Sequence, residues 1–346
     1  MRGIVHGIVR GAVRRKPKED SATHDKPPGL SALSEDEVRN IFWHACNPLE
    51  PRVALAFSSA SRELWALTLA QRLQLRSNHQ SAAALCRKVD KRWRHFSQAR
   101  SCKELREATK IESVRPSAAD LAVLGTLSRV LPALEEMHLS AAAGSGALGV
   151  YTASERYTRL FPARGTAGLD GVPRLVAGLG AGALPAVTTL AIYHLHVGDA
   201  GASALAAALG RGALPRLEKL TLCNAAIGNA GLVALAAALR RRSTLISLRL
   251  MNNPLGDEGL AAIAAEAPGS TWPPKGGLPK LKELNLEDTQ ITDVGCATLI
   301  SAFASGTLPA LQKLVLRGIP ARAAAQHAVR DVSYECRVYV GDRRYL

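Results

Sequence analysis

The stretch LPRLEKLTL, residues 214–222, decides the fold, because near-copies of it recur along the chain. The copies are LPALEEMHL from Leu131, LPAVTTLAI from Leu184, LPKLKELNL from Leu278 and LPALQKLVL from Leu308, with a looser one, STLISLRL, ending at Leu250. The last residue of each copy and the apolar residue two positions before it, which are leucines in most copies, point to one face of a β-strand. We predict that this face is the core and that the intervening residues point away from it.

A helical pattern follows each predicted strand. GDAGASALAAALGRG after Ile192 and GNAGLVALAAALRRR after Leu222 begin with Gly, Asp or Asn and continue with apolar residues at helical spacing. Gly and Pro then end each helix and begin the next strand. The second leucine of the copies defines a period of about 30 residues, at the positions Leu134, Val187, Leu217, Leu245, Leu281 and Leu311. The longer interval from Leu134 to Val187 contains either a degenerate repeat or an insertion.

This pattern resembles the ribonuclease-inhibitor type of leucine-rich repeat over roughly residues 131–340. The resemblance implies an α/β leucine-rich repeat solenoid, in which stacked strand–helix repeats form a curved parallel sheet and one continuous core. We assign it to residues 117–346, with a Pro/Gly-rich insertion at 267–277 and a closing strand at CRVYV, residues 336–340. Members of that family often carry Asn or Cys at the turn after the strand, where the side chain bonds the backbone of neighbouring repeats. Here only Asn253 matches, and Thr289 is a partial substitute.

Composition argues against an enzyme. Hydrophobic residues make up 47% of the chain but aromatic residues only 4%, whereas ligand pockets tend to be lined by aromatic side chains. The phosphate-binding GxxxxGK[ST] loop, the GxSxG elbow and the HExxH motif are all missing from the sequence. We therefore predict no catalytic residues, no cofactor and no metal site.

The cysteines and the charge give an expected location. The 6 cysteines are scattered without a CxxC pair, which favours reduced thiols in an intracellular protein over zinc sites or a disulfide framework. No apolar run reaches the length of about 18 residues that a transmembrane helix needs. We expect a cytoplasmic or nuclear protein. The basic start, residues 1–28, is either a disordered arm or an organelle-targeting segment.

Basic residues also surround Trp93 and Phe96 in the segment 69–116, which is otherwise helical in pattern. Such interleaving can bind nucleic acid, but it is more often a solvated helix face with one aromatic side chain tucked inward. We do not expect nucleic acid as a partner. The net charge of +15 is uneven, because residues 1–116 hold 22 Lys and Arg against 12 Asp and Glu, and so carry +10 of it.

The strand positions that point away from the core would line one curved surface, the concave face. Curved solenoids use this surface to bind proteins, and Tyr, Arg and Met are enriched where binding energy concentrates. The alternative is that these are ordinary solvated strand positions. We predict a protein partner on this face, in contact with Tyr193, His194, Lys219, Thr221, Arg249, Met251, Asn252, Glu283, Asn285, Glu287, Lys313 and Arg317.

The segment LSEDEVRNIFWHACNPLEPRVALAFSSASRELWALT, residues 33–68, predicts three short helices. Ser34 followed by Glu37 is a capping-box start. Three helices this short cannot bury all of their apolar residues, so some apolar surface is left for a partner. The segment belongs to a predicted helical domain at 29–116.

The same segment resembles an F-box, in which three helices dock on the Skp-type adaptor of cullin ubiquitin ligases and the following repeats capture the substrate. The opening is Leu33-Ser34 where that family usually has Leu-Pro. The resemblance implies adaptor binding through Leu33, Val38, Ile41, Phe42, Val53, Leu55, Phe57 and Trp65.

The sequence thus predicts non-enzymatic protein–protein recognition, with a substrate receptor of a cullin-type ubiquitin ligase as its most specific form. One alternative is a repeat scaffold or sensor in which residues 29–116 merely cap the solenoid. Another, by fold analogy, is a GTPase-activating protein of the Ran type. The acidic tail expected of that type is missing, since the sequence ends in GDRRYL.

Overall fold

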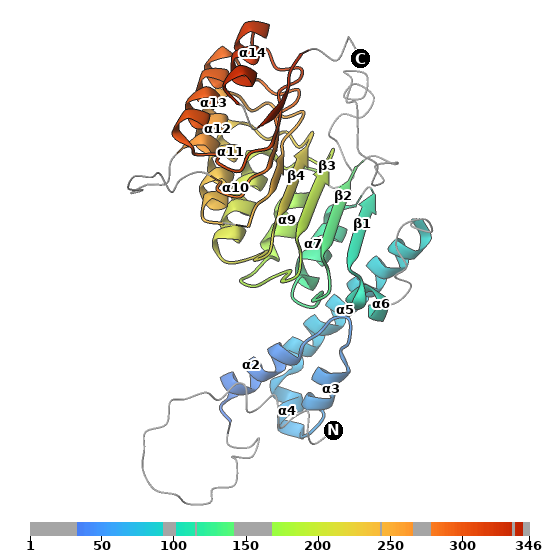
Figure 1. The fold of residues 1–346 in the computed structure, drawn as a ribbon. Helices are drawn as coiled ribbons and strands as arrows, with labels where there is room; N and C mark the ends of the chain where they lie inside the picture. The colour runs from blue at the N-terminus through green and yellow to red at the C-terminus, as the bar shows by residue number, and fades with distance from the viewer. Residues whose placement is uncertain are drawn as a thin grey trace, which may run out of the picture. The chain divides into compact units, whose positions relative to one another are not determined.

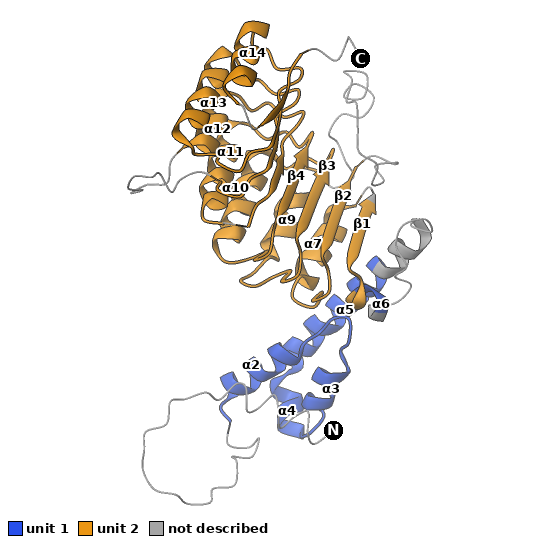
Figure 2. Ribbon diagram, in the orientation of Figure 1, with its two compact units in different colours: residues 1–88, 99–105 blue, residues 89–98, 106–346 orange. Residues whose placement is uncertain are grey.

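The computed structural model describes residues 33–92, 102–114, 116–141, 168–242, 244–265, 278–333 and 336–341. The chain divides into two compact units (Figure 2). The helical unit comprises residues 1–88 and 99–105, and the repeat unit comprises residues 89–98 and 106–346. The predicted arm at 1–28 and the predicted insertion at 267–277 lie outside the described residues.

The helical unit contains the three short helices that the sequence predicts. They are α2 (Glu35–Ala45), α3 (Arg52–Ser58) and α4 (Arg62–Leu67), and the longer α5 (Leu69–Arg92) follows them. The capping box is confirmed, because the Glu37 N–H donates to Ser34 Oγ at 3.3 Å and the Ser34 N–H donates to the Glu37 carboxylate at 3.0 Å. The apolar side of α2 packs against the next helices in one small core, which contains Val38, Ile41, Phe42, Ala45, Ala54, Phe57, Leu64 and Leu75.

The repeat unit is built on a parallel sheet that has eight strands within the described residues, ordered β1 to β8 as they occur in the chain (Figure 1). The strands are β1 (Lys110–Val114), β2 (Glu136–Ser140), β3 (Thr189–Tyr193), β4 (Lys219–Cys223), β5 (Ser247–Arg249), β6 (Glu283–Asn285), β7 (Lys313–Val315) and β8 (Arg337–Tyr339).

Helices cover one side of this sheet (Figure 1). They are α7 (Ala118–Leu127), α9 (Gly171–Ala177), α10 (Gly198–Gly210), α11 (Asn229–Arg240), α12 (Asp257–Ala264), α13 (Asp293–Ser305) and α14 (Ala323–Val332), and α6 (Cys102–Glu107) precedes β1. Strands and helices alternate with each helix packed on its neighbours. The fold is therefore the predicted leucine-rich repeat solenoid, including the closing strand near the C-terminus.

The core confirms the leucine pattern. Leu220 in β4 pairs in register with Leu190 in β3 and Leu248 in β5, and all three are at most 3% exposed. The second leucine-type residue of each copy is at most 5% exposed, namely Leu134, Val187, Leu217, Leu245, Leu281 and Leu311. Burial of these aliphatic rows between sheet and helices is the main force that holds the repeats together.

Strand β1 lies in the stretch that the sequence assigned to the helical domain. It pairs with β2 along its whole length, so the sheet begins before the boundary expected at 116/117. The leucine pattern does not reveal this strand, because Ala108 and Ser113 stand where the next copy has Leu134 and Leu139.

The long interval between Leu134 and Val187 contains an insertion and not an additional repeat of the sheet. Strands β2 and β3 are direct neighbours, paired from Glu136 with Thr189 to Ser140 with Tyr193. No further strand can therefore lie between them. Helix α9 occupies the end of this interval, and residues 142–167 lie outside the described part of the chain.

Neighbouring repeats are tied together at the turn that follows the strand. The Asn253 side chain accepts the backbone N–H groups of Ala225 and Ile227 at 3.0 and 3.1 Å. It also donates to the carbonyls of Leu222 and Leu250 at 2.7 and 2.8 Å. Asn253 therefore has the role that its match to the family pattern predicts. The Thr289 hydroxyl bonds within its own repeat, to the Leu286 carbonyl at 2.6 Å.

A second tie lies at the helix N-termini. The Asp199 carboxylate accepts the N–H groups of Gly228 and Gly231 at 2.7 and 3.0 Å, so a residue of α10 caps the start of α11. The same link recurs from Asn229 to α12, from Asp257 to α13 and from Asp293 to α14. The Asp or Asn that the sequence places at each helix start thus caps the next helix along the array.

Candidate recognition surface

The concave face is formed by the strand side chains that point away from the helices. Alternation along β4 places Leu220 and Leu222 in the core and leaves Lys219 and Thr221 on the opposite side. Because the strands are in register, equivalent positions form rows across the sheet. The face, as we define it, consists of Lys110, Glu112, Glu136, His138, Thr189, Tyr193, Lys219, Thr221, Ser247, Arg249, Met251, Glu283, Asn285, Glu287, Lys313, Arg317, Arg337 and Tyr339.

Ten of the predicted partner contacts lie on this face. Tyr193, Lys219, Thr221, Arg249, Glu283, Asn285 and Lys313 are strand residues, and Met251, Glu287 and Arg317 directly follow the strands. Backbone bonds extend the register beyond the assigned strands, from Asn252 N–H to the Glu287 carbonyl and from Asp288 N–H to the Arg317 carbonyl, each at 2.9 Å.

His194 and Asn252 differ from this pattern because they occupy the turn after the strand. Both have left-handed backbone, with φ of 55° and 58°. His194 is only 8% exposed, and its Nδ1 lies 2.9 Å from the Asn224 amide nitrogen. Burial lowers the pKa of His194 and so favours the neutral ring. These two residues lie at the edge of the face, where His194 is buried and Asn252 is half-buried.

Exposure varies along the face. Lys219 is exposed, and Tyr193, Arg249, Met251, Glu283, Lys313 and Arg317 are half-buried. Thr221, Asn285 and Glu287 are 6 to 9% exposed. Half-buried polar side chains with ordered neighbours lose less entropy on binding than fully exposed ones. The accessible part of the predicted set therefore consists of Tyr193, Lys219, Arg249, Met251, Glu283, Lys313 and Arg317.

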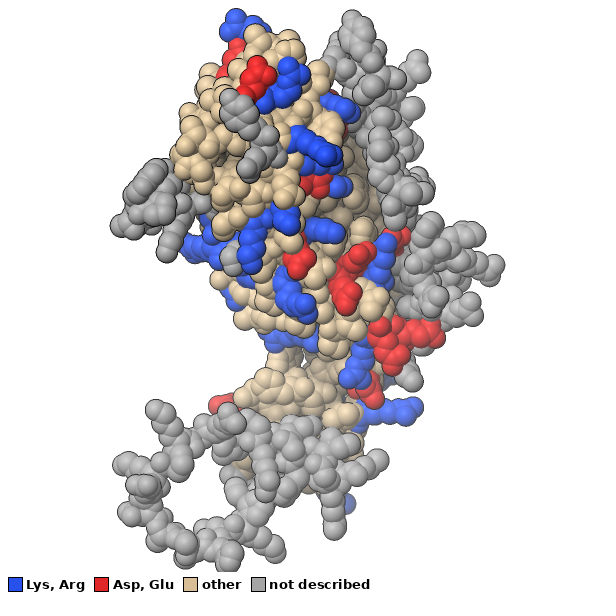
Figure 3. Space-filling model, viewed as in Figure 1, with Lys and Arg blue, Asp and Glu red and all other residues tan. Residues whose placement is uncertain are grey.

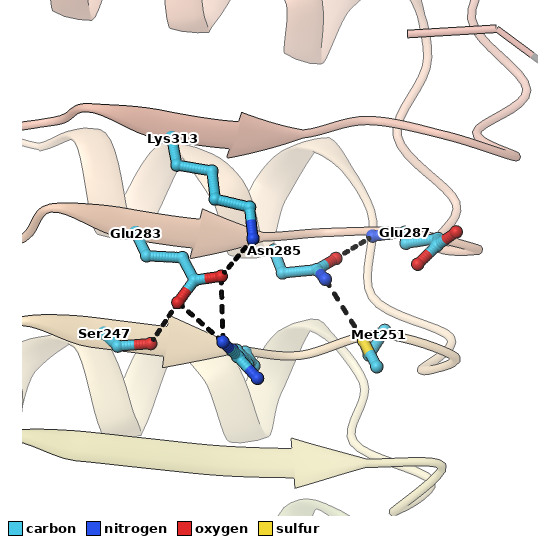
Figure 4. A network of polar contacts seen from close by, with 7 residues as sticks. Ser247, Met251, Glu283, Asn285, Glu287 and Lys313 are labelled. Atoms are coloured by element: carbon cyan, nitrogen blue, oxygen red, sulfur yellow. Dashed lines mark hydrogen bonds and ion pairs between the residues drawn. The ribbon is translucent and has the colours of Figure 1, made fainter. Parts of the chain in front are cut away.

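Glu283 is the centre of a polar network on this face (Figure 4). Its carboxylate accepts hydrogen bonds from Ser247 Oγ at 3.0 Å, Arg249 Nη2 at 2.9 Å and Lys313 Nζ at 2.9 Å. Partial burial alone would raise the pKa of Glu283, but the hydrogen bonds and charges of Arg249 and Lys313 outweigh it and lower the pKa. The carboxylate is thus ionised near neutral pH and fixes the positions of both cations.

A second chain of contacts continues from β5 to β6 (Figure 4). The Asn285 amide donates to the Met251 sulfur at 3.2 Å and accepts the Glu287 N–H at 3.0 Å. Nearby, burial raises the pKa of the Cys223 thiol to about 12. A thiol with such a pKa is a poor nucleophile. This part of the face is therefore an ordered contact surface without a reactive group.

The two ends of the face differ in charge. At β1 and β2, Lys110 lies 2.7 Å from Glu112 and 3.5 Å from Glu136, and Glu136 lies 3.3 Å from His138. Figure 3 shows acidic side chains near these first strands. At β7 and β8, the cations of Lys313 and Arg317 lie 5.9 and 5.5 Å from the centre of the Tyr339 ring.

Several residues of the face are missing from the predicted contacts. Lys110 and Glu112 lie on β1, which the leucine pattern does not reveal. Four others are outward positions of predicted strands that the prediction leaves out, namely Glu136, His138, Thr189 and Ser247. Arg337 and Tyr339 lie in the predicted closing strand, where the alternation of CRVYV places both on the side opposite Val338. That alternation is the signal in the sequence that could have added them.

The predicted adaptor-binding residues separate into two groups in the helical unit. Val38, Ile41, Phe42 and Phe57 are at most 4% exposed and form its core, so the interpretation of these four as contact residues is corrected. The physical reason is that the apolar side of α2 packs onto α3 and α4. Leu33 is half-buried against the same core.

The other three predicted residues are accessible. Val53, Leu55 and Trp65 are 37%, 42% and 47% exposed, and the guanidinium of Arg72 lies 3.3 Å from the centre of the Trp65 ring. Three further exposed apolar side chains of this unit were not predicted, namely Trp43, Leu69 and Leu73. These six side chains are distributed over α2, α3, α4 and α5.

Within the described part of the chain, no group of three or more His, Cys, Asp or Glu side chains is arranged to hold a metal ion. Cys46, Cys223, Cys296 and Cys336 are free thiols. Among the same residues, no helix combines the length and the apolar character needed to cross a membrane.

A family model agrees with the repeat fold. The leucine-rich repeat family model matches residues 243–264 and 277–299, two consecutive repeats that contain β5, α12, β6 and most of α13. No curated protein matches the sequence. Among solved structures, an internalin (inlF) from Listeria monocytogenes is similar, with 14% identity, a TM-score of 0.27, and coverage of 76% of this chain and 91% of that chain.

Proposed function

We propose that this protein recognises another protein through the concave face and has no chemistry of its own. The observation that carries this proposal is the Glu283 network, in which one carboxylate positions Ser247, Arg249 and Lys313 on an open sheet surface. Ordering polar side chains before binding reduces the entropy lost on association. The repeats, each with one strand and one helix, support the ribonuclease-inhibitor-like subtype.

The residue types on the face fit this role. Tyr193, Arg249 and Met251 are half-buried and belong to the types that contribute most to protein interfaces. The free thiols of the described cysteines support placement in a reducing compartment, as expected for a cytoplasmic or nuclear protein.

A pair of double variants tests this proposal. Tyr193→Ala with Lys219→Glu changes the concave face, and Val233→Ala with Arg241→Glu makes the same kinds of change at exposed positions of α11 and its C-cap. Partners captured by the immobilised full chain are purified and their affinities measured by surface plasmon resonance. We expect the face variant to weaken binding by about tenfold or more and the helix-side variant to leave it unchanged. Equal affinities for both variants would refute the proposal.

A second candidate function is adaptor binding by the helical unit, as in a substrate receptor of a cullin-type ubiquitin ligase. The exposed apolar side chains of Val53, Leu55 and Trp65 favour it. Ile41→Asp is a poor test, since Ile41 is 2% exposed and a buried charge would unfold the unit.

Val53→Asp with Leu55→Asp is a better test, because both residues are exposed and lie in the first turn of α3, where acidic side chains are tolerated. The matched control is Val294→Asp, which is 65% exposed in the first turn of α13. Binding of a purified Skp-type adaptor by the full chain and the control, with loss in the α3 variant, supports a ligase receptor. Absence of adaptor binding by the unaltered chain supports a repeat scaffold or sensor without a ligase link.

A further inference from the structure

The end of the concave face at β7 and β8 is cationic. Lys313, Arg317 and Arg337 project from it together with Tyr339, and residues 311–318 and 336–341 contain no Asp or Glu. Tyr339 stands in register with Val315, so its ring lies in the middle row, beside the Lys313 and Arg317 side chains. We call Arg317, Arg337 and Tyr339 the cationic corner.

Two carboxylates from the β6 segment lie beside this end of the face, namely Glu283 and Glu287. Glu287 stands in register with Arg317 and is 7% exposed. Glu283 accepts from Arg249 and Lys313, each at 2.9 Å, and its charge is balanced by these two cations. Within the described residues, no ion pair joins Arg317 or Arg337 to a carboxylate. Arg337 is exposed and Arg317 is half-buried. Two guanidinium groups therefore remain available for anionic groups from outside.

The opposite end of the face carries the opposite charge, because Glu112 and Glu136 share a single lysine, Lys110. A nucleic acid would lay uniform negative charge along the sheet and would meet these carboxylates. A protein segment can instead place its carboxylates at one end only. Charge complementarity therefore favours a protein with a local acidic segment over a polyanion.

We propose that the cationic corner binds an acidic segment of the protein partner, with Asp or Glu carboxylates on Arg317 and Arg337 and an apolar side chain on the ring of Tyr339. Guanidinium groups bind carboxylates through paired, charge-assisted hydrogen bonds. The proposal rests on the concave face being the recognition surface and specifies the chemistry of the partner and the end of the sheet where it binds.

The test uses the full chain and a displayed library of random peptides about 12 residues long, selected at about 100 mM NaCl, where exposed charges still act over about 10 Å. Selected peptides are synthesised with a fluorophore and their affinities measured by anisotropy. The corner variants are Arg317→Glu with Arg337→Glu and, as a milder form, Arg317→Ala with Arg337→Ala. The matched control is Arg216→Glu with Arg241→Glu, two exposed arginines outside the concave face. Thermal unfolding verifies that each variant is folded.

The proposal predicts that the selected peptides are enriched in Asp and Glu, and that the charge-reversed corner weakens their binding by about tenfold or more while the control does not. Peptides that depend on Tyr193 and Lys219 but are not acidic, or that bind the corner variants normally, would overturn the cationic corner and leave concave-face recognition intact. Peptides that ignore every concave-face variant would overturn both.

Discussion

Polar residues of the same types have different roles in two regions of the repeat unit. Between repeats, a stacking set made of Asn253, Asp199, Asn229, Asp257 and Asp293 bonds to the backbone of a neighbouring repeat. On the concave face, Glu283 bonds only to side chains. The difference lies in the partners, because an unpaired backbone N–H at a helix start or a buried turn is costly. Substitutions in the stacking set should therefore reduce stability, whereas those on the face should reduce binding.

The largest loss of stability is expected from Asn253→Ala. This change leaves the buried N–H groups of Ala225 and Ile227 without their acceptor. Unpaired buried donors and the lost carbonyl contacts together should lower the free energy of unfolding by about 3 to 5 kcal/mol. The free energy of unfolding is measured by urea denaturation of the full chain. The control is Asn252→Gly, at a half-buried turn position whose φ of 58° suits glycine, and its unfolding should change little. Equal losses in both variants would contradict the role assigned to Asn253.

The next largest loss of stability is expected from Gly231→Ala. A Cβ there would lie 2.6 Å from Asp199 Oδ1 and 2.9 Å from the Asp199 Cα, so the link between α10 and α11 must shift. We expect a loss of about 1 to 3 kcal/mol in the free energy of unfolding, as is usual for overpacking. Gly210→Ala, where a Cβ meets nothing within 4 Å, should be neutral or stabilising. Thermal unfolding midpoints of the two variants should therefore move in opposite directions.

Asp199→Ala removes the cap of α11 without adding atoms. The expected loss is about 1 kcal/mol, the usual value of a helix cap. Asp199→Asn should keep most of the stability, because Asn229 makes the same link from α11 to α12 naturally. Chemical denaturation gives the free energies of unfolding of Asp199→Ala and Asp199→Asn for comparison. If Asp199→Asn lowers the free energy of unfolding as much as Asp199→Ala does, Asp199 does not stabilise the protein through the capping bond.

The smallest effect on stability is expected from Glu283→Gln. The folded-state pKa of Glu283 is lowered because its ion pairs with Arg249 and Lys313 outweigh burial. Its contribution is therefore present above the unfolded pKa of about 4.3 and is lost as the pH falls through the folded pKa. The difference between the original chain and Glu283→Gln should stay below about 1 kcal/mol near neutral pH because of solvent screening. It should shrink further in unfolding curves recorded toward acidic pH, and a difference that grows there would contradict this sign.

The parts of the fold that repeat in the sequence could be predicted, and those that depend on contacts between repeats could not. Leucine spacing located β2 to β7, and the position of Asn253 after its strand revealed the turn bond. The link from Asp199 to Gly231 could not be predicted, because Asp at a helix start is expected to serve its own helix. Strand β1 was missed because Ala108 and Ser113 replace leucines.

The candidate site, like the fold, was predictable where it follows from the pattern within one repeat and not where it depends on contacts between repeats. Alternation along each strand identified the outward positions, but not which of them contact one another. Ser247 and Arg249 reach Glu283 from one repeat away, at sequence separations of 36 and 34 residues. Only the register of the strands brings them together. In the helical unit, helical spacing identified Val38, Ile41 and Phe42 as one apolar stripe but could not tell whether it faced a core or a partner.

The most direct test of concave-face recognition is site-specific photo-crosslinking in the full chain. A photoreactive amino acid replaces Lys219, which is exposed on β4, or Arg241, which is exposed after α11. After irradiation in cell extract, mass spectrometry identifies the proteins joined at each position. We predict a specific partner crosslinked from position 219 and not from position 241. A partner crosslinked only from position 241 would contradict the assignment of the concave face as the recognition surface.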